Sequence, residues 1–330
     1  MKPSASKAVS IIQVQVDLGT SLEGSALGPI AMEYARLTQE LEALGYTVKK
    51  EPVEIKASRS SSPARMPVAE EKERLDQLAE SCSRLSQLVE YSIRKSVVPI
   101  VIGGDHSLSI GSCAGVCNYF QDRMDSVGLL WLDAHGDYHT YATSRTKNVH
   151  GMGLSIVLGR ADVGEELATL YPSEHVFSPK NAAHVGARAL DPPEVTAMFT
   201  GHPLGHVLTI DSVEEKGIAG IVAELAGALF NRIRHLHVSL DLDVVDIAFA
   251  PGVGTGVRAG LTHRELLFLM KLLHEQIAAQ KLTLSLDVVE LDPIRDTGNT
   301  TAQLAVELVS VLFGRPTFQV PDNCWKEHGR

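Results

Sequence analysis

The chain has 330 residues, of which 44% are hydrophobic and 21% are charged, and its formal net charge is −10. The apolar content is enough for an ordinary core, and the length suits two modest domains or one large α/β domain. The negative charge argues against nucleic acid or an anionic membrane as the main partner. No apolar run approaches the ~18 residues needed to cross a bilayer. With four cysteines and no secretory signal in "MKPSASKAVS", we expect a cytoplasmic protein.

The first part of the chain alternates between strand and helix patterns. Residues 9–16 predict a strand, and residues 28–45 predict a helix with Pro29 in its first turn and Gly45 at its end. Residues 46–55 predict a polar edge strand, and the Ser-rich residues 56–65 a surface loop. A long helix then continues to about residue 96.

The same alternation continues to the end of the chain. Further strands are predicted at residues 97–105, 127–133, 184–188, 206–211, 236–243 and 282–290, and further helices at residues 217–233, 262–279 and 300–314. Near-continuous Val, Ile and Leu in strands that alternate with helices indicate a mainly parallel sheet covered on both faces. About eight strands fit a closed barrel or an open sandwich, and in both the ligand site forms at the carboxyl ends of the strands. We expect one domain over residues 1–330.

Acids and imidazoles gather at the predicted carboxyl ends of four strands. They are Asp105 and His106 in "VIGGDH"; Asp133, His135 and Asp137 in "LLWLDAHGD"; Asp241, Asp243 and Asp246 in "HVSLDLDVVD"; and Glu290 in "SLDVVE". Residues two apart in a strand point to the same side, so each pair can address one site. Crowded carboxylates cannot all stay ionised without cations among them. An oxygen-rich set with a few imidazoles favours manganese.

Structural explanations apply to individual members of these clusters. A lone aspartate at a strand end is more often a helix cap or a loop acceptor, and Asp246 is open to that interpretation. Cys113 and Cys117, four apart in a predicted helix, are better explained as a buried apolar face than as a ligand pair. Independent caps do not account for D-x-H-x-D, D-x-D and GGDH on three strands, and the combination favours a metal site.

These motifs resemble a known family. "IGGDHS", "DAHGD", "NVHGM", "SLDLDVVD" with "APGVGTG", and "SLDVVELDP" are similar to the ordered signatures of the ureohydrolase superfamily, and the similarity extends from about residue 9 to residue 314. "GARALDPPE" and "VGTGV" resemble the arginase branch, particularly its bacterial type. The resemblance implies an open three-layer α/β/α sandwich with a mainly parallel, roughly eight-stranded sheet. It also implies a homotrimer or homohexamer.

Carried over by position, the resemblance implies two Mn²⁺ ions per subunit. His106, Asp133, Asp137 and Asp241 would bind one ion, and His135 and Asp243 the second, with Asp133 and Asp241 as shared bridges. Two such ions can lower the pKa of a shared water, so that hydroxide exists near neutral pH. That hydroxide would attack the guanidinium carbon of L-arginine, giving L-ornithine and urea.

The resemblance implies further catalytic roles for three residues. Asp137 would carry a proton to the leaving amine, and Glu290 would hold the guanidinium by a charge-assisted contact. His150 is similar to the family's proton shuttle to solvent, the alternative being an ordinary surface-loop histidine.

Contacts to the amino-acid end of the substrate are implied for His139, Ser144, Thr146, Asp191, Glu194 and Thr255. This part of the sequence departs from the family pattern: His139 stands where Asn is usual, and Lys147 replaces a glycine. Ile247 stands where proline is usual, and "GTG" (254–256) where "GTP" is usual, so each loosens a loop. The added positive charge, with Arg145, could favour a substrate with an extra or displaced carboxylate. The interpretation that we favour is that His139 and Thr146 replace the usual donors while Arg145 and Lys147 point to solvent.

Two rival functions stay open at this point. One is a ureohydrolase acting on another guanidino or formimino compound, suggested by the altered substrate loop. The other is a catalytically silent binding protein, which the intact set of candidate metal ligands argues against.

Overall fold

The computed structural model describes residues 7–53, 68–160, 167, 169–171 and 176–317. Its centre is one eight-stranded sheet with the order β2-β1-β3-β8-β7-β4-β5-β6, in which every neighbouring pair is parallel. The strands are β1 (Ala8–Val14), β2 (Thr47–Val53), β3 (Val98–Ile102), β4 (Val127–Leu132), β5 (Ala182–Val185), β6 (His206–Leu208), β7 (His235–Asp241) and β8 (Thr283–Val289). The prediction of a parallel, eight-stranded open sheet is confirmed.

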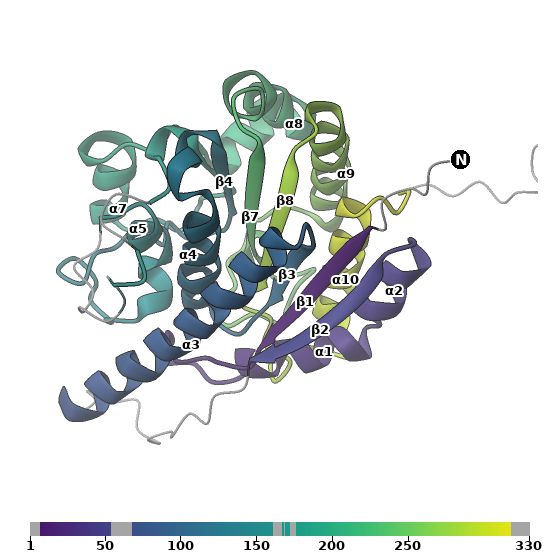
Figure 1. Ribbon diagram of the computed structural model, residues 1–330. Helices are drawn as coiled ribbons and strands as arrows, with labels where there is room; N and C mark the ends of the chain where they lie inside the picture. The colour runs from purple at the N-terminus through teal and green to yellow at the C-terminus, as the bar shows by residue number, and fades with distance from the viewer. Residues whose placement is uncertain (1–6, 54–67, 161–166, 168, 172–175, 318–330) are drawn as a thin grey trace, which may run out of the picture.

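Helices cover both faces of this sheet (Figure 1). The main ones are α1 (Gly28–Tyr34), α2 (Leu37–Ala43), α3 (Val68–Arg94), α4 (Ser109–Phe120), α5 (Gly153–Val157), α7 (Pro192–Thr196), α8 (Ile210–Leu225), α9 (His263–Gln280) and α10 (Thr300–Leu312). The core has two parts: α1, α2, α8, α9 and α10 bury side chains against one face, and α3, α4 and α5 against the other. In β4, Leu130 and Leu132 belong to the first part and Leu129 and Trp131 to the second, as expected for a strand buried on both sides.

Several element boundaries differ from prediction because local backbone signals decide them. The helix predicted over residues 28–45 is interrupted at Arg36, whose φ of 71° ends the α-helical hydrogen-bond ladder and starts α2. The strand predicted over residues 206–211 ends at Leu208, because the Thr209 side chain accepts a hydrogen bond from Ser212 N and caps α8. The loop predicted at residues 56–65 lies outside the described residues.

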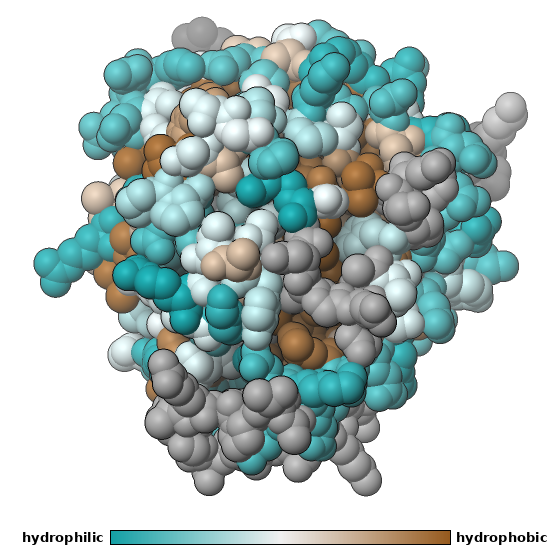
Figure 2. Space-filling view, turned by 90° about the vertical axis from the view of Figure 1, so that its left-hand side faces the viewer, coloured by the Kyte–Doolittle hydropathy of each residue, from teal (hydrophilic) through white to brown (hydrophobic). Residues whose placement is uncertain are grey.

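The described surface is mixed in character. The side of the molecule nearest α5 and α7 is mainly hydrophilic, with separate apolar patches (Figure 2). Val195 in α7 and Phe199 just after it are among the exposed apolar side chains. None of the helices in the described ranges has the length and apolar character needed to span a bilayer.

Candidate metal and catalytic site

The four central strands of the sheet, β3, β8, β7 and β4, carry the predicted polar clusters at adjacent carboxyl ends. In β4 and β7, Leu132 pairs with Leu240, so Asp133 and Asp241 follow side by side. Asp241 in turn pairs with Val289 of β8, which places Glu290 at the next position. The strand order thus brings together clusters that lie far apart in the sequence.

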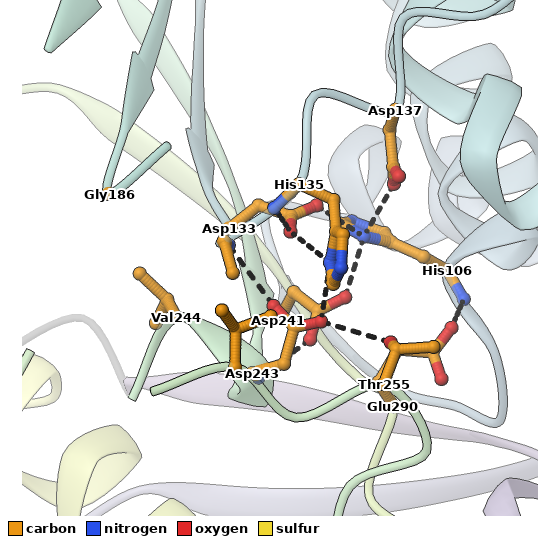
Figure 3. A network of polar contacts seen from close by, with 12 residues as sticks. His106, Asp133, His135, Asp137, Gly186, Asp241, Asp243, Val244, Thr255 and Glu290 are labelled. Carbon is orange, nitrogen blue, oxygen red and sulfur yellow. Dashed lines mark hydrogen bonds and ion pairs between the residues drawn. The ribbon is translucent and has the colours of Figure 1, made fainter. Parts of the chain in front are cut away.

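A glycine next to this edge has a clear steric reason. Gly186 follows β5 with a φ of 101°, and a Cβ there would lie 2.5 Å from Val244 Cγ2 and 3.1 Å from the backbone oxygen of Asp133. A side chain at position 186 would therefore clash with Val244 and with the backbone of Asp133, both of which lie close to Gly186 (Figure 3). The predicted strand over residues 184–188 ends here, at Val185.

Three carboxylates converge on one imidazole nitrogen. His106 Nδ1 lies 3.2 Å from Asp133 Oδ2, 3.0 Å from Asp137 Oδ2 and 3.0 Å from Asp241 Oδ2 (Figure 3). Among the described residues, His106 Nδ1 and Asp137 Oδ2 are buried polar atoms without a hydrogen-bond partner. Buried polar atoms rarely stay unsatisfied, and this donor set is what a divalent cation binds, so the residues fit a metal ion.

A second group shares one member with the first. His135 Nδ1 lies 2.9 Å from Asp243 Oδ2 and 3.7 Å from Asp133 Oδ1. Asp133, with one oxygen toward each histidine, belongs to both candidate ligand groups. Asp241 lies on the His106 side, and its Oδ1 accepts a hydrogen bond from Asp243 N at 2.7 Å. The geometry brings all six predicted metal ligands together.

The electrostatics of the cluster call for added positive charge. Burial and the charge of Asp133 raise the pKa of Asp137 to about 7, and burial with neighbouring carboxylates raises the pKa of Asp241 and of Asp243. Burial lowers the pKa of His135, but hydrogen bonds to Asp133 and Asp243 outweigh it and raise this pKa to about 12. Protons therefore occupy the cluster when no cation does.

Two supporting residues were not predicted. Ser239 Oγ contacts His106 Nε2 at 2.9 Å and so fixes the ring with Nδ1 toward the carboxylates. Trp131 stacks on the same ring with centroids 4.1 Å apart, and its Nε1 donates to Asp133 Oδ2 at 3.0 Å. Ser239 and Trp131 each precede a predicted ligand by two residues, and this same-face spacing is the signal that could have found them.

Glu290 and His150 form an ion pair beside the metal cluster. His150 Nδ1 lies 2.9 Å from Glu290 Oε1, which also accepts a hydrogen bond from His106 N at 2.9 Å. Burial lowers the pKa of His150, but Glu290 outweighs burial and raises it to about 9. The structure therefore places both residues at the cluster and holds His150 inward rather than as a free surface-loop histidine.

Glu194 has a structural role that the sequence did not reveal. It is the third residue of α7, and its carboxylate accepts hydrogen bonds from Tyr138 N at 3.1 Å and from Asp191 N at 3.0 Å. This is one half of a capping box, with Asp191 as the N-cap. Glu194 is buried, so its carboxylate joins α7 to the loop after β4.

His139 lies at a second cluster with these acids. Its Nε2 is 3.5 Å from Asp191 Oδ2 and 3.7 Å from Glu194 Oε2, and its Nδ1 contacts Thr143 Oγ1 at 3.1 Å. Arg145 is largely exposed, as expected, and its Nη2 is 3.5 Å from Asp191 Oδ2. The expectation that Lys147 points to solvent is wrong.

The Lys147 side chain folds back on its own loop, where it contacts both the backbone and the ring of Tyr141. Its ammonium donates to the backbone oxygen of Tyr141 and stands 4.6 Å from the centroid of that ring. Its φ of 62° is the left-handed conformation for which glycine is the usual residue.

The remaining predicted contacts lie in different places. Thr255 joins the metal cluster, since its Oγ1 donates to Asp243 Oδ2 at 3.2 Å. Ser144 Oγ and Thr146 Oγ1 accept hydrogen bonds from the backbone of their own loop.

The residues for which a structural explanation was open have structural contacts. Asp246 accepts hydrogen bonds from Ala248 N and Gly260 N, as a loop acceptor does. Cys113 and Cys117 are buried in the core, as predicted.

The fold and the site define an α/β protein with a candidate metal centre: a parallel three-layer α/β/α sandwich with candidate metal ligands at the carboxyl ends of its central strands. The comparisons with known proteins are more specific. Residues 7–314 match the model of the "Arginase family", and the chain therefore belongs to the arginase family, whose members are metal-dependent ureohydrolases.

Individual relatives agree over nearly the whole chain. The arginase of Bacillus subtilis (strain 168) is 34% identical over 310 residues, which are 94% of this chain and 98% of that protein. The arginase of Bacillus caldovelox is 36% identical over 313 residues, or 93% and 98%. The crystal structure of Bacillus subtilis arginase superposes with a TM-score of 0.82 at 33% identity, covering 94% of this chain and 100% of that one.

Proposed function

We propose that this protein is a dinuclear manganese hydrolase that converts L-arginine to L-ornithine and urea. The observation that carries the proposal is the pair of ligand groups sharing Asp133 at the carboxyl ends of the central strands. Membership of the arginase family supports the same reaction.

Six residues would hold the two ions. His106, Asp133, Asp137 and Asp241 suit one ion, and His135, Asp243 and the shared carboxylates suit the other. Four carboxylates with two imidazoles are a donor set that suits manganese. Two such ions, when bound, would lower the pKa of bound water and supply hydroxide near neutral pH, which the weakly electrophilic guanidinium carbon requires.

The chain's own residues would orient the substrate and move protons. Glu290, held in place by His106 N and His150, offers a carboxylate to the cationic guanidinium. Cleavage of the C–N bond needs a proton on the leaving amine, and Asp137 would deliver it from Oδ2. His150 would exchange that proton with solvent, because its imidazole pairs with Glu290 on the inner side and keeps partial exposure.

The residues proposed to bind the amino-acid end of the substrate suggest a second candidate function. His139 lies within 3.5 Å of Asp191 and 3.7 Å of Glu194, so the acids proposed to bind an α-amino group already face an imidazole. This contact favours, as the alternative, a ureohydrolase for another guanidino or formimino compound. Ser144, Thr146 and Thr255 stay in the proposal as further substrate contacts.

A urea assay tests the substrate directly. Manganese-loaded protein is incubated with arginine, agmatine, guanidinobutyrate and formiminoglutamate, and urea or formamide release is measured. We expect arginine to give the highest kcat/KM. Turnover of another compound without urea from arginine would select the alternative, and no turnover with two bound ions would reject both.

The proposal includes assembly and location. The family resemblance supports a homotrimer or homohexamer in the cytoplasm. Light scattering on the purified protein would give the subunit number, and a monomer would contradict this part.

A further inference from the structure

A groove of about 720 Å³ lies at the opposite end of the sheet from the metal cluster. His235 and Thr283, the first residues of β7 and β8, line it. The ends of α3, α4, α9 and α10 form its walls. This volume is in the range of small-molecule sites, roughly 300–1,000 Å³.

The walls of the groove are largely apolar and aromatic. Tyr46 and Phe313 meet edge to face with centroids 5.4 Å apart on one side, and Tyr119 and Phe120 meet similarly at 4.7 Å on the other. Ile277 and Leu284 also line it. Such walls suit a ligand with an aromatic or aliphatic body.

The inner end of the groove is uncharged but polar. The buried His235 contacts Thr283 Oγ1 and Ser285 Oγ, each at 2.9 Å, so both ring nitrogens are satisfied. Burial lowers the pKa of His235 to about 3, so the ring is neutral at physiological pH. A ligand's charged group would therefore have to sit elsewhere, toward the rim.

The rim carries cations without acidic partners. Arg123, Arg234 and Lys281 line the groove, and none of the described residues that line it is acidic. Within the described ranges these three side chains make no ion pair: Arg123 stands over Tyr119 and Phe120, and Arg234 contacts only a backbone oxygen. In a chain of net charge −10, this is a local excess of positive charge beside an apolar groove.

We propose that this groove binds an organic anion with an aromatic or aliphatic body and a carboxylate or sulfonate group. The body would pack between the aromatic walls, and the anionic group would contact the rim cations Arg123, Arg234 and Lys281 by charge-assisted hydrogen bonds. The site is separate from the metal cluster and does not depend on the proposed function.

A pair of dyes that differ in charge tests the binding. Anilinonaphthalene sulfonate is titrated into the full-length, manganese-loaded protein, and fluorescence is compared with that of neutral phenylnaphthylamine. We expect one sulfonate dye per subunit and about tenfold weaker binding of the neutral dye, because the latter lacks the charge-assisted contacts. Equal affinity for the two dyes would overturn the proposal.

Two variants and a matched control locate the site. Arg234→Gln combined with Lys281→Gln should weaken binding of the sulfonate dye about tenfold and leave binding of the neutral dye unchanged. Arg232→Gln, which removes an exposed cation that is not among the residues lining the groove, should change the binding of neither dye. Ala278→Trp, at an exposed position of α9 that lines the groove, should abolish binding of both dyes by filling the space.

Thermal unfolding and manganese content would show that each variant is folded. Sulfonate binding that survives Ala278→Trp would place the dye elsewhere and reject the proposal. A lower subunit number for Ala278→Trp in light scattering would show that the groove is a subunit contact, which also rejects it.

Discussion

Asp137 and Glu290, the two carboxylates proposed to handle protons and guanidinium, share an unusual backbone conformation. Their φ angles are 47° and 64°, in the left-handed region that non-glycine residues rarely adopt. Each such residue costs on the order of 1–3 kcal/mol and persists only where its surroundings hold it. Here Asp137 O accepts from Ser155 N, and Glu290 N donates to Gly104 O. This strain at both positions supports a functional rather than structural reason for these residues.

A single carboxylate should control both ion sites. Because Asp133 belongs to both ligand groups, we expect Asp133→Ala to bind less than one manganese per subunit after gel filtration, measured by mass spectrometry of the metal. Asp246→Asn, which changes a carboxylate that accepts hydrogen bonds from Ala248 N and Gly260 N, should keep two ions. Two tightly bound ions in Asp133→Ala would show that the ligand assignment is wrong.

The Ser239 hydroxyl, which contacts His106 Nε2, should affect metal affinity without being a ligand itself. Ser239→Ala removes the contact to His106 Nε2, so the ring loses its fixed orientation, and we expect roughly 10–100-fold weaker manganese binding. Competition with a fluorescent chelator measures this affinity. Ser310→Ala, a buried serine of α10 that donates to Val306 O, is the matched control and should leave metal affinity unchanged. If both variants behave alike, the effect is general destabilisation rather than ligand orientation.

At the scale of elements, the strands and their polar ends were predictable because the pattern is local. An apolar run followed by Asp133, His135 and Asp137 identifies both a strand and its carboxyl end. The break between α1 and α2 was not predictable, because Arg36 carries no residue-type signal for a φ of 71°. The sequence predicted Glu194 as a substrate contact only. Its capping box with Asp191 could not be predicted, because it requires knowing that α7 begins at Pro192.

His235, the first residue of β7, should make the free energy of unfolding depend on pH. The folded-state pKa of His235 is about 3, against an ordinary value of about 6.5 in the unfolded chain. The unfolded state therefore binds more protons between these values, so stability is full above about pH 6.5 and falls as the pH drops toward about 3. From pH 7 to pH 5 this group alone should cost about 2 kcal/mol.

Urea unfolding of metal-free protein at the two pH values measures this effect. His235→Gln, which can still bond to Thr283 and Ser285, should lose about 2 kcal/mol less than the original chain over the same range. Equal losses in the two proteins would contradict the depressed pKa of His235.

At the scale of the molecule, the order of the strands creates the site. Sequence motifs identify the candidate ligands, but only the neighbourhood of β3, β8, β7 and β4 brings GGDH, D-x-H-x-D and D-x-D to one edge. The pattern of alternating strands and helices fits a barrel equally well, so the residues alone could not give that order. One end of the same sheet carries clustered acids, and the other carries the cationic groove.

The clustered acids should make metal a large part of the protein's stability. Without cations the cluster keeps protons, as the raised pKa values of Asp137, Asp241 and Asp243 indicate, and ions that replace those protons bind only the folded chain. At a free manganese concentration of about 100 times Kd, each site contributes about 2.7 kcal/mol. Two sites should then raise Tm by roughly 10 °C over chelator-treated protein.

Differential scanning calorimetry with and without manganese checks this increase. Asp133→Ala is the control, because a chain that has lost its shared ligand should show little or no increase. The same increase in both proteins would mean that manganese stabilises the chain at another place. No increase in the original chain would mean that the carboxylates are held by protons and hydrogen bonds alone, and the proposed hydrolase would then lack its metal centre.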